Sequence, residues 1–283
     1  MATLIDARPA ASVNGRWVTW GQLRPAMTEA AGAIALEEHI LDQAVAAAVE
    51  SAGLTITPDD VAAERLLLLE SLHEDPDTAV RLLGELRDRE GLGPNRFDAL
   101  LMRNASLRAL VRNQVEVTEE AIRRLHQIRY GPQRQARLVV VPDLAAALDV
   151  AARALSGERF GDIAVEVSID SSAARGGLLE PISRLEPTYP EALRKAMWGL
   201  EAGEVSSPIL LDDRYAVLLL VRKIDGDGVP VEEVREKLAK LVRLDQERLL
   251  MNQLRRSLVA NVSVTVFDEA LFDSWKRRRR SER

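Results

Sequence analysis

The chain has 283 residues, of which 29% are charged, and a formal net charge of −6, so it is long enough for two domains. Its hydrophobic fraction of 47% is that of a soluble globular protein, which excludes a disordered chain, and the negative charge disfavours a general nucleic-acid binder. No stretch approaches the roughly 20 apolar residues that a membrane helix requires, so no membrane span is expected.

Cysteine and histidine usage limits the chemistry that the chain can perform. Absence of cysteine excludes disulfides, thiolate nucleophiles and iron–sulfur sites. The three histidines, His39, His73 and His126, are spread over separate segments, and no acid–base role is assigned to them. Neither a metal site nor a cofactor is therefore expected.

The first predicted element is a β-hairpin over residues 12–20. Asn14 and Gly15 lie between apolar residues, which is a strong signal for a two-residue hairpin turn. We expect Trp17 and Trp20 to rest on a neighbouring helix.

Five helices are predicted next, each from apolar residues at helical spacing with signals for its start and end. Thr57 and Thr118 are expected to cap two of them, and Gly53 ends the first. The predicted helices cover approximately residues 36–52, 57–73, 75–91, 94–115 and 118–130. The N-terminal region is therefore helical apart from its hairpin.

The middle of the chain mixes strands and helices. Residues 137–141, R-L-V-V-V, predict a strand, and Asp143 caps a helix after it. A loop rich in serine and glycine follows, then a helix over residues 189–200. Two apolar runs separated by Asp212 and Asp213 predict a second hairpin.

The C-terminal segment begins with a turn and a long amphipathic helix over residues 231–259. Residues 262–267 alternate like a strand, and we expect this strand to pair with the N-terminal hairpin near Val13 and Val18. The basic end, residues 276–283, is expected to be a solvated, frayed terminus rather than a patch for anionic partners.

Several motifs occur in one order between residues 160 and 218: F-G-D-I-A-V-E-V-S, D-S-S-A-A-R-G-G-L-L-E-P-I, G-E-V-S-S-P-I and Y-A-V-L. This arrangement resembles the parvulin family of peptidyl-prolyl cis-trans isomerases over residues 135–225. The helical region, with V-N-G near its start and a V-T-E-E helix, is similar to that of the bacterial foldases SurA and PrsA.

These resemblances imply an α+β fold in three segments. Residues 1–134 form a mostly helical SurA/PrsA-like domain, and residues 135–225 form a parvulin-like (FKBP-like) α/β isomerase domain. Residues 226–283 supply the long helix and a strand, which are expected to pack back on the N-terminal domain and complete it.

The parvulin resemblance implies a polar network of two histidines, a cysteine or aspartate, and a hydroxyl. Asp170 matches the cysteine-or-aspartate position and is the candidate catalytic residue. Arg137 and Ala216 occupy the places of the two histidines, and Leu211 that of a threonine. Asp170 alone is also a common turn residue, and Arg137 alone could serve in an ion pair.

The resemblance also implies an apolar pocket for the proline ring, formed by Leu179, Tyr189, Leu193 and Trp198. The same residue types at helical spacing are typical of core packing. Both interpretations of these four residues stay open at this point.

The expected function is that of a foldase that binds unfolded or proline-containing polypeptides, with isomerase activity weakened or lost because the polar network is largely replaced. Whether the chain is an enzyme stays open. The alternative is a non-catalytic chaperone or client-specific maturation factor that uses the parvulin fold for peptide binding or as a scaffold. The resemblance implies an extracytoplasmic protein, whereas the N-terminus lacks a signal-peptide pattern, and a full-length chain would then be cytoplasmic.

Overall fold

The computed structural model describes residues 6–260 and 262–281, which divide into two compact units. Unit 1 contains Met1–Val115 and Asp245–Arg283, and unit 2 contains Glu116–Leu244. The first five residues, which begin the segment interpreted above as lacking a signal-peptide pattern, lie outside the described residues, as do the last two of the basic end. Among the described helices, none combines the length and the low charge needed to cross a lipid bilayer.

The chain begins with the predicted hairpin, whose strands β1 (Pro9–Val13) and β2 (Arg16–Thr19) pair in antiparallel register. Asn14 and Gly15 adopt φ angles of 50° and 77°, the left-handed values that the tight turn requires. Trp17 does not rest on a helix as expected, because it is 69% exposed.

Helix α1 (Trp20–Ser51) begins at Trp20 rather than at Leu36. The backbone N–H of Thr19 donates to Gln22 Oε1 at 2.8 Å, which starts the helix with a capping interaction that the sequence analysis did not anticipate. Pro25 lies inside the helix, where its missing N–H and its ring disfavour a regular turn, and it obscured the helical pattern of this stretch.

The remaining helices of unit 1 match the predicted order, except that the last one, α10, was not predicted. They are α2 (Pro58–Leu72), α3 (Pro76–Arg89), α4 (Pro94–Val111), with the 3-10 turn η1 (Arg112–Gln114) after it, the second half of α9 (Val231–Ala260), and α10 (Glu269–Ser281). Phe97 and Leu101 of α4 are buried in a cluster with Leu83 of α3 and flanking residues of α2. Leu107 of α4 is buried beside Leu41 of α1, with apolar residues of α9 packed around them.

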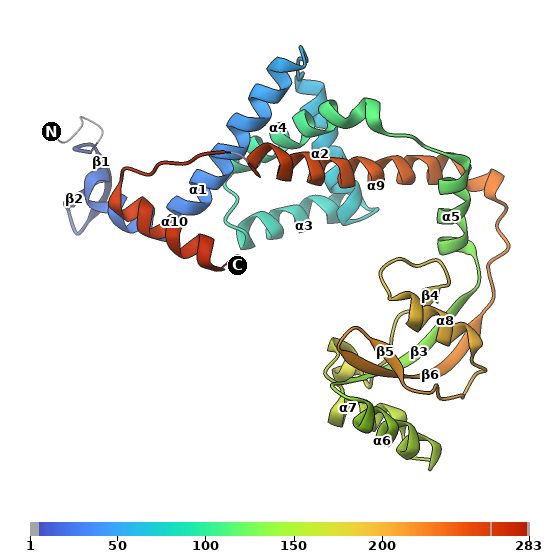
Figure 1. The fold of residues 1–283 in the computed structure, drawn as a ribbon. Helices are drawn as coiled ribbons and strands as arrows, with labels where there is room; N and C mark the ends of the chain where they lie inside the picture. Colours follow the sequence, from blue (N-terminus) through green and yellow to red (C-terminus); the bar gives the residue numbers. More distant parts are fainter. Residues whose placement is uncertain (1–5, 261, 282–283) are drawn as a thin grey trace. The chain divides into compact units, whose positions relative to one another are not determined.

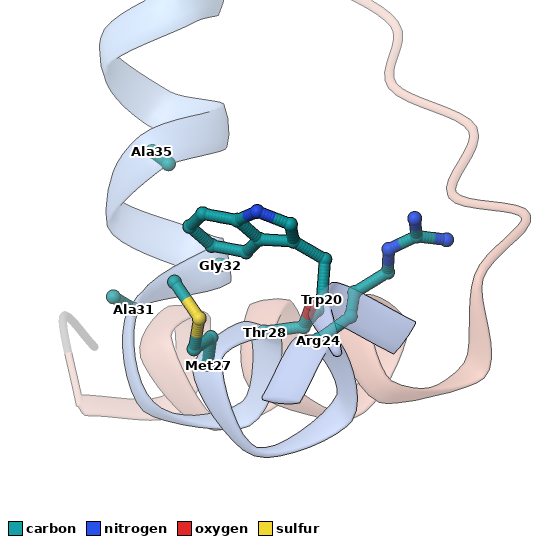
Figure 2. A pocket seen from close by; sticks show the side chains of 7 residues that line it. All are labelled: Trp20, Arg24, Met27, Thr28, Ala31, Gly32 and Ala35. Atoms are coloured by element: carbon teal, nitrogen blue, oxygen red, sulfur yellow. The ribbon is translucent and has the colours of Figure 1, made fainter. Parts of the chain in front are cut away.

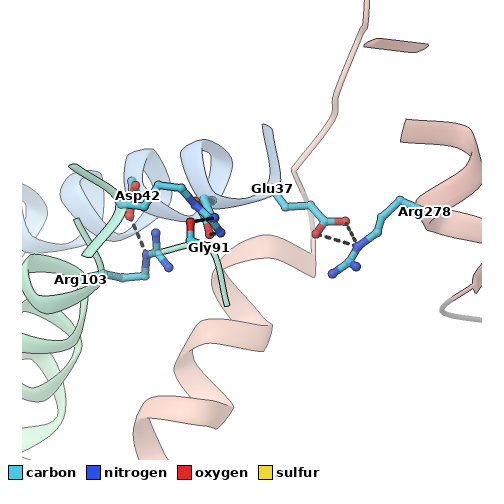
Figure 3. A network of polar contacts seen from close by, with 7 residues as sticks. Glu37, Asp42, Gly91, Arg103 and Arg278 are labelled. Atoms are coloured by element: carbon cyan, nitrogen blue, oxygen red, sulfur yellow. Dashed lines mark hydrogen bonds and ion pairs between the residues drawn. The ribbon is translucent and has the colours of Figure 1, made fainter. Parts of the chain in front are cut away.

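Acidic residues of α1 hold arginines from two other helices. Figure 3 shows the pairs of Glu37 with Arg278 and of Asp42 with Arg103. A third pair joins Glu38 to Arg96. The Arg96 guanidinium donates to both oxygens of Glu38, at 2.9 and 2.6 Å, and this hydrogen bonding lowers the pKa of the Glu38 carboxyl. The pairs fix the register of α4 and α10 along α1.

The C-terminal segment differs from its prediction. Residues 262–267 form no strand, and β1 pairs with β2 alone within the described residues, so the expected pairing with the hairpin was wrong. Instead α10 packs along α1: the N–H of Ala33 donates to Ser274 Oγ at 3.2 Å, and Leu271 lies over Gly32. Residues 276–280 therefore end a helix and are not frayed, although all five are exposed to solvent as expected.

Unit 2 is a four-stranded antiparallel sheet with helices on both faces (Figure 1). Its elements are α5 (Glu119–Tyr130), β3 (Gln133–Val141), α6 (Leu144–Leu155), α7 (Phe160–Val167), η2 (Ser171–Arg175), β4 (Ile182–Ser183), α8 (Glu191–Gly199), β5 (Ile209–Leu211), β6 (Arg214–Ile224) and the first half of α9. The strand order is β4-β3-β6-β5. The whole is the predicted α+β fold, a helical region plus an α/β domain.

Alternation along the strands creates two separate cores in unit 2. On one face, Val139 and Val141 of β3 are buried with residues of α6 and α7. On the other face, Ala136, Leu138 and Val140 are buried beneath α8 and the segment before it. A third cluster joins α5 to the first half of α9 through Ile122, Leu238 and Val242.

Candidate functional site

The loop around η2 is the first part of the candidate site. Asp170 begins η2, because its Oδ1 accepts hydrogen bonds from the N–H and the hydroxyl of Ser172, at 2.8 and 2.6 Å. Gly177 has a φ of 72°, and a Cβ there would lie 2.3 Å from the carbonyl oxygen of Leu138. Only glycine allows this approach, which lets Leu138 N–H donate to Gly177 O at 2.8 Å and joins the loop to β3.

The structure brings the predicted apolar residues together on the α8 face of the sheet. Leu179, Leu193 and Ala216 are buried in one cluster, and Tyr189 and Trp198 pack against it while half-buried. Leu211 of β5 packs against the same cluster. Their proximity is established, whereas contact with a proline ring stays a prediction.

Burial divides the cluster into an inner and an outer layer. Leu179 is 6% exposed and Leu193 only 3%, so these two side chains form the buried inner layer, and a ligand would contact little of their surface. The accessible layer consists of half-buried side chains, namely Tyr189, Trp198, Ile209 and Leu211. Trp198 is in addition covered by the guanidinium of Arg134, 5.2 Å from its ring centroid.

Arg137 does not join this cluster. Its Nη1 donates to the carbonyl oxygens of Gly176 at 2.6 Å and Arg175 at 3.3 Å, and it lies beside Gly161 of α7, on the opposite face of the sheet. The β3 residues on the same face as Ala216 are Ala136, Leu138 and Val140, of which Val140 pairs directly with Ala216 and Leu138 is 4% exposed. Sequence reasoning missed Leu138, although the alternation of apolar residues at 136, 138 and 140 was a signal that could have identified it.

Tyr189 supplies a hydroxyl to the cluster. Its pKa is raised above the usual tyrosine value, chiefly by burial and then by the negative charges of Asp170, Glu186 and Glu180, while Arg175 opposes the shift. Tyr189 therefore keeps its proton at neutral pH and can donate a hydrogen bond. Asp170 acts on this hydroxyl through its charge.

His126 is the histidine of unit 2, and it lies outside the apolar cluster. It stacks on Tyr130 with ring centroids 5.3 Å apart, and its Nε2 lies 2.8 Å from the carbonyl oxygen of Val229. These contacts join α5 to the segment that precedes α9, which is a structural role.

A pocket of about 400 Å³ lies on α1 in unit 1 and was not predicted (Figure 2). Its lining is almost wholly apolar and consists of Trp20, Arg24, Met27, Thr28, Ala31, Gly32 and Ala35. Trp20 is 42% exposed and Met27 51%, so both are accessible from solvent. These lining residues were not predicted to be helical, because the predicted helix began at residue 36, after the last of them.

Comparisons with known proteins found a matching family, similar proteins and similar solved structures. Residues 117–236 match the family described as the PPIC-type PPIASE domain. Foldase protein PrsA 4 of Bacillus cereus is 30% identical over 153 residues, 52% of each chain, so the match spans about half of that relative's length. Foldase protein PrsA of Oceanobacillus iheyensis is 25% identical over 244 residues, 83% of this chain and 78% of the relative. Among solved structures, the peptidylprolyl isomerase PrsA of Bacillus anthracis aligns at 19% identity with a TM-score of 0.47, covering 82% of this chain and 99% of that one.

The sheet, the glycine loop and the family match together define unit 2 as a parvulin-type, or PPIC-type, domain. Joined to it is a helical unit that is completed by the C-terminal helices. Residues 117–236 thus match a parvulin-type domain, and the chain as a whole is similar to the PrsA foldases.

Proposed function

We propose that the chain is a foldase whose unit 2 binds proline-containing segments of client polypeptides and turns X-Pro bonds at a reduced rate. The observation that carries the proposal is the single apolar cluster that gathers Leu179, Tyr189, Leu193 and Leu211 beside the Asp170 loop. The match of residues 117–236 to the PPIC-type domain supports it.

Rotation about a peptide bond must overcome a barrier of ~18–20 kcal/mol, because the planar amide is stabilised by resonance. The twisted amide has lost this resonance and its charge separation, so apolar surroundings disfavour the planar form more than the twisted form. The half-buried Tyr189 and Leu211 would supply such surroundings. The protonated hydroxyl of Tyr189 would donate to an amide or carbonyl group of the client.

The reduced rate follows from what faces the cluster. Leu138 and Ala216 present only apolar atoms, so the polar network of parvulins is replaced there. Each placed hydrogen-bond donor lost from such a site costs on the order of a hundredfold to a thousandfold in rate. Apolar binding and the Tyr189 hydroxyl would then supply the remaining acceleration.

The test is isomerisation of an alanyl-prolyl peptide, followed by NMR exchange so that no coupling protease is needed. We expect a rate above background at high protein concentration, with kcat/KM reduced about tenfold or more in Tyr189→Ala. Phe267→Ser changes an exposed side chain in unit 1 and serves as a matched control. If the wild-type protein shows no acceleration but binds the peptide, the non-catalytic alternative replaces this proposal.

A second activity is favoured by the pocket at Trp20. We propose that unit 1 binds apolar side chains of unfolded clients and so delays their aggregation, independently of unit 2. The accessible Trp20 and Met27 support this proposal, since aromatic and methionine side chains are enriched at recognition surfaces. Trp20→Ser should lower the suppression of client aggregation and leave the isomerase rate unchanged, and an unchanged suppression would argue against the pocket.

The resemblance to SurA and PrsA also leads us to propose an extracytoplasmic location. Fractionation of cells that express the gene from its own start would test this. Recovery in the cytosol alone would contradict the proposal.

A further inference from the structure

We propose that Arg194 is a positioning residue: it clamps the segment from Arg184 to Tyr189 so that the Tyr189 hydroxyl is presented to the client amide. The inference rests on the function proposed above, in which that hydroxyl donates a hydrogen bond. One side chain holds the two ends of the segment together. Arg194 Nε donates to the carbonyl oxygen of Tyr189 at 3.1 Å, and its Nη1 donates to that of Arg184 at 2.6 Å.

The position of Arg194 in α8 explains how it reaches both carbonyl oxygens. Pro190 precedes the helix, and α8 begins at Glu191, so Arg194 lies in the first turn. Side chains of a helix lean toward its N-terminus, which directs this guanidinium back over the segment before the helix. The guanidinium carries its donors in a rigid planar fork, so it can hold two carbonyl groups at a fixed separation, whereas a lysine ammonium is a single point of charge.

The stability of α8 does not account for this arginine. A cation in the first turn lies near the positive end of the helix dipole and gains nothing there. The helix is already attached to the sheet by Leu193 and Met197, which are 3% and 1% exposed. Arg194 itself is half-buried, and ordering its long side chain costs conformational entropy. The clamp therefore fixes the preceding segment rather than the helix.

The clamped segment carries two groups of the candidate site. Tyr189 is its last residue, and Glu186, whose negative charge helps to raise the pKa of the Tyr189 hydroxyl, lies within it. Glu186 Oε1 accepts from the hydroxyl and the N–H of Thr188, at 2.6 and 3.3 Å, and the N–H of Glu186 donates to Ser183 O at 3.1 Å. If both ends were released, the segment would move as a loop and take the tyrosine with it.

A double-mutant cycle on the isomerisation of the alanyl-prolyl peptide tests the proposal. Tyr189→Phe removes the hydroxyl and Arg194→Met removes the clamp. Each should lower kcat about tenfold and change KM little, because a displaced donor is lost from the transition state. The two changes together should cost no more than either alone, since Arg194 acts through the hydroxyl. Additive losses would overturn the proposal, because a general effect on folding does not depend on the hydroxyl.

Two further variants separate the geometry of the clamp from its charge. Arg194→Lys keeps the cation but not the fork, so it should recover little of the lost rate, and full recovery would refute the clamp. Lys195→Met is the matched control, since it removes an exposed cation from the neighbouring position of α8. It should leave kcat unchanged, and a loss equal to that of Arg194→Met would also refute the clamp.

Amide hydrogen exchange reports on the clamp without any isomerase activity. Arg194→Met should speed exchange about tenfold at the N–H groups of Glu186 and Thr188, and unchanged exchange there would contradict the proposal. If the wild-type protein binds the peptide without turning its X-Pro bond, the proposed function fails while the clamp is still tested. The same cycle is then measured on the dissociation constant of the peptide, where non-additive losses are expected and additive losses would refute the clamp.

Discussion

The ion triad at the centre of unit 1 provides a sharp test of how its helices are held together. Arg108 of α4 donates to Glu64 of α2 and to Glu247 of α9, and its Nη2 lies 3.1 Å from Glu64 Oε2. Both carboxylate side chains are only 6% exposed, and the Arg108 side chain is 26% exposed. The perturbation is Arg108→Met, which keeps most of the volume and removes the charge.

The variant leaves two buried carboxylates facing each other without a cation. Removing one partner of a buried pair costs about 3–5 kcal/mol of unfolding free energy, because the remaining charge is desolvated and uncompensated. In urea, with a denaturant slope of roughly 2 kcal/mol per molar, the unfolding midpoint of unit 1 should fall by about 1.5–2.5 M.

Tryptophan emission can isolate unit 1 in this measurement. Of the four tryptophans, only Trp198 lies in unit 2, so a Trp198→Phe background makes the signal specific. Arg81→Met is the matched control: it removes the same charge from an exposed pair with Glu85 and should cost less than about 1 kcal/mol. If Arg108→Met lowers the midpoint no more than Arg81→Met, the triad does not hold α9 to unit 1.

Three further predictions concern unit 2. Gly177→Ala should lower the unfolding free energy of unit 2 by about 2–4 kcal/mol, measured by thermal unfolding, because the new Cβ would meet the carbonyl oxygen of Leu138. The control is Gly157→Ala, where φ is 98° and a Cβ would meet nothing within 4 Å. It should cost only about 1 kcal/mol in the same experiment. The isomerase rate should be flat from about pH 6 to pH 8, because the cluster holds no histidine. A bell-shaped rate profile near neutrality would contradict this account of the site. The raised pKa of Tyr189 means that the folded state holds the tyrosine proton more tightly than the unfolded state does. This contribution to stability is therefore present below the ordinary tyrosine pKa of about 10 and is lost as pH rises beyond it. Arg137→Met should speed amide hydrogen exchange in the η2 loop without lowering kcat, and a loss of kcat with unchanged exchange would instead make Arg137 catalytic.

Local rules of the backbone were sufficient for much of the fold. The hairpin turn at Asn14 and Gly15 was predictable because its left-handed angles suit few other residues. Helix starts at Asp75 and Asp143 were predictable because each side chain accepts a hydrogen bond from an N–H three residues later, at 2.8 and 2.9 Å. Such interactions lie within one turn, so their signals lie within a few letters of sequence.

Predictions failed where the structure of a segment depends on which distant segment it packs against. Residues 262–267 alternate like a strand, but a strand also needs an edge to pair with, and α10 docks on α1 instead. The predicted start of helix α1 was too late in the chain, because Pro25 interrupts the helical pattern. The helix also contacts α10 and α4, and these contacts are not visible in the sequence. Arg137 was matched to the place of a family histidine from its position in the sequence, whereas the direction of a strand side chain depends on which face the sheet buries.

The sequence by itself determined the order of elements, their caps and the parvulin-like motifs, because these depend on neighbouring residues and on a glycine loop of fixed length. Only the tertiary structure decided that Leu138 and Val140, rather than Arg137, lie on the same face as Ala216. It also decided that Leu179 and Leu193 are buried beneath the accessible layer, and that an apolar pocket is open at Trp20. These properties are set by packing between elements far apart in the chain, where burial, and not local spacing, selects which side chains meet.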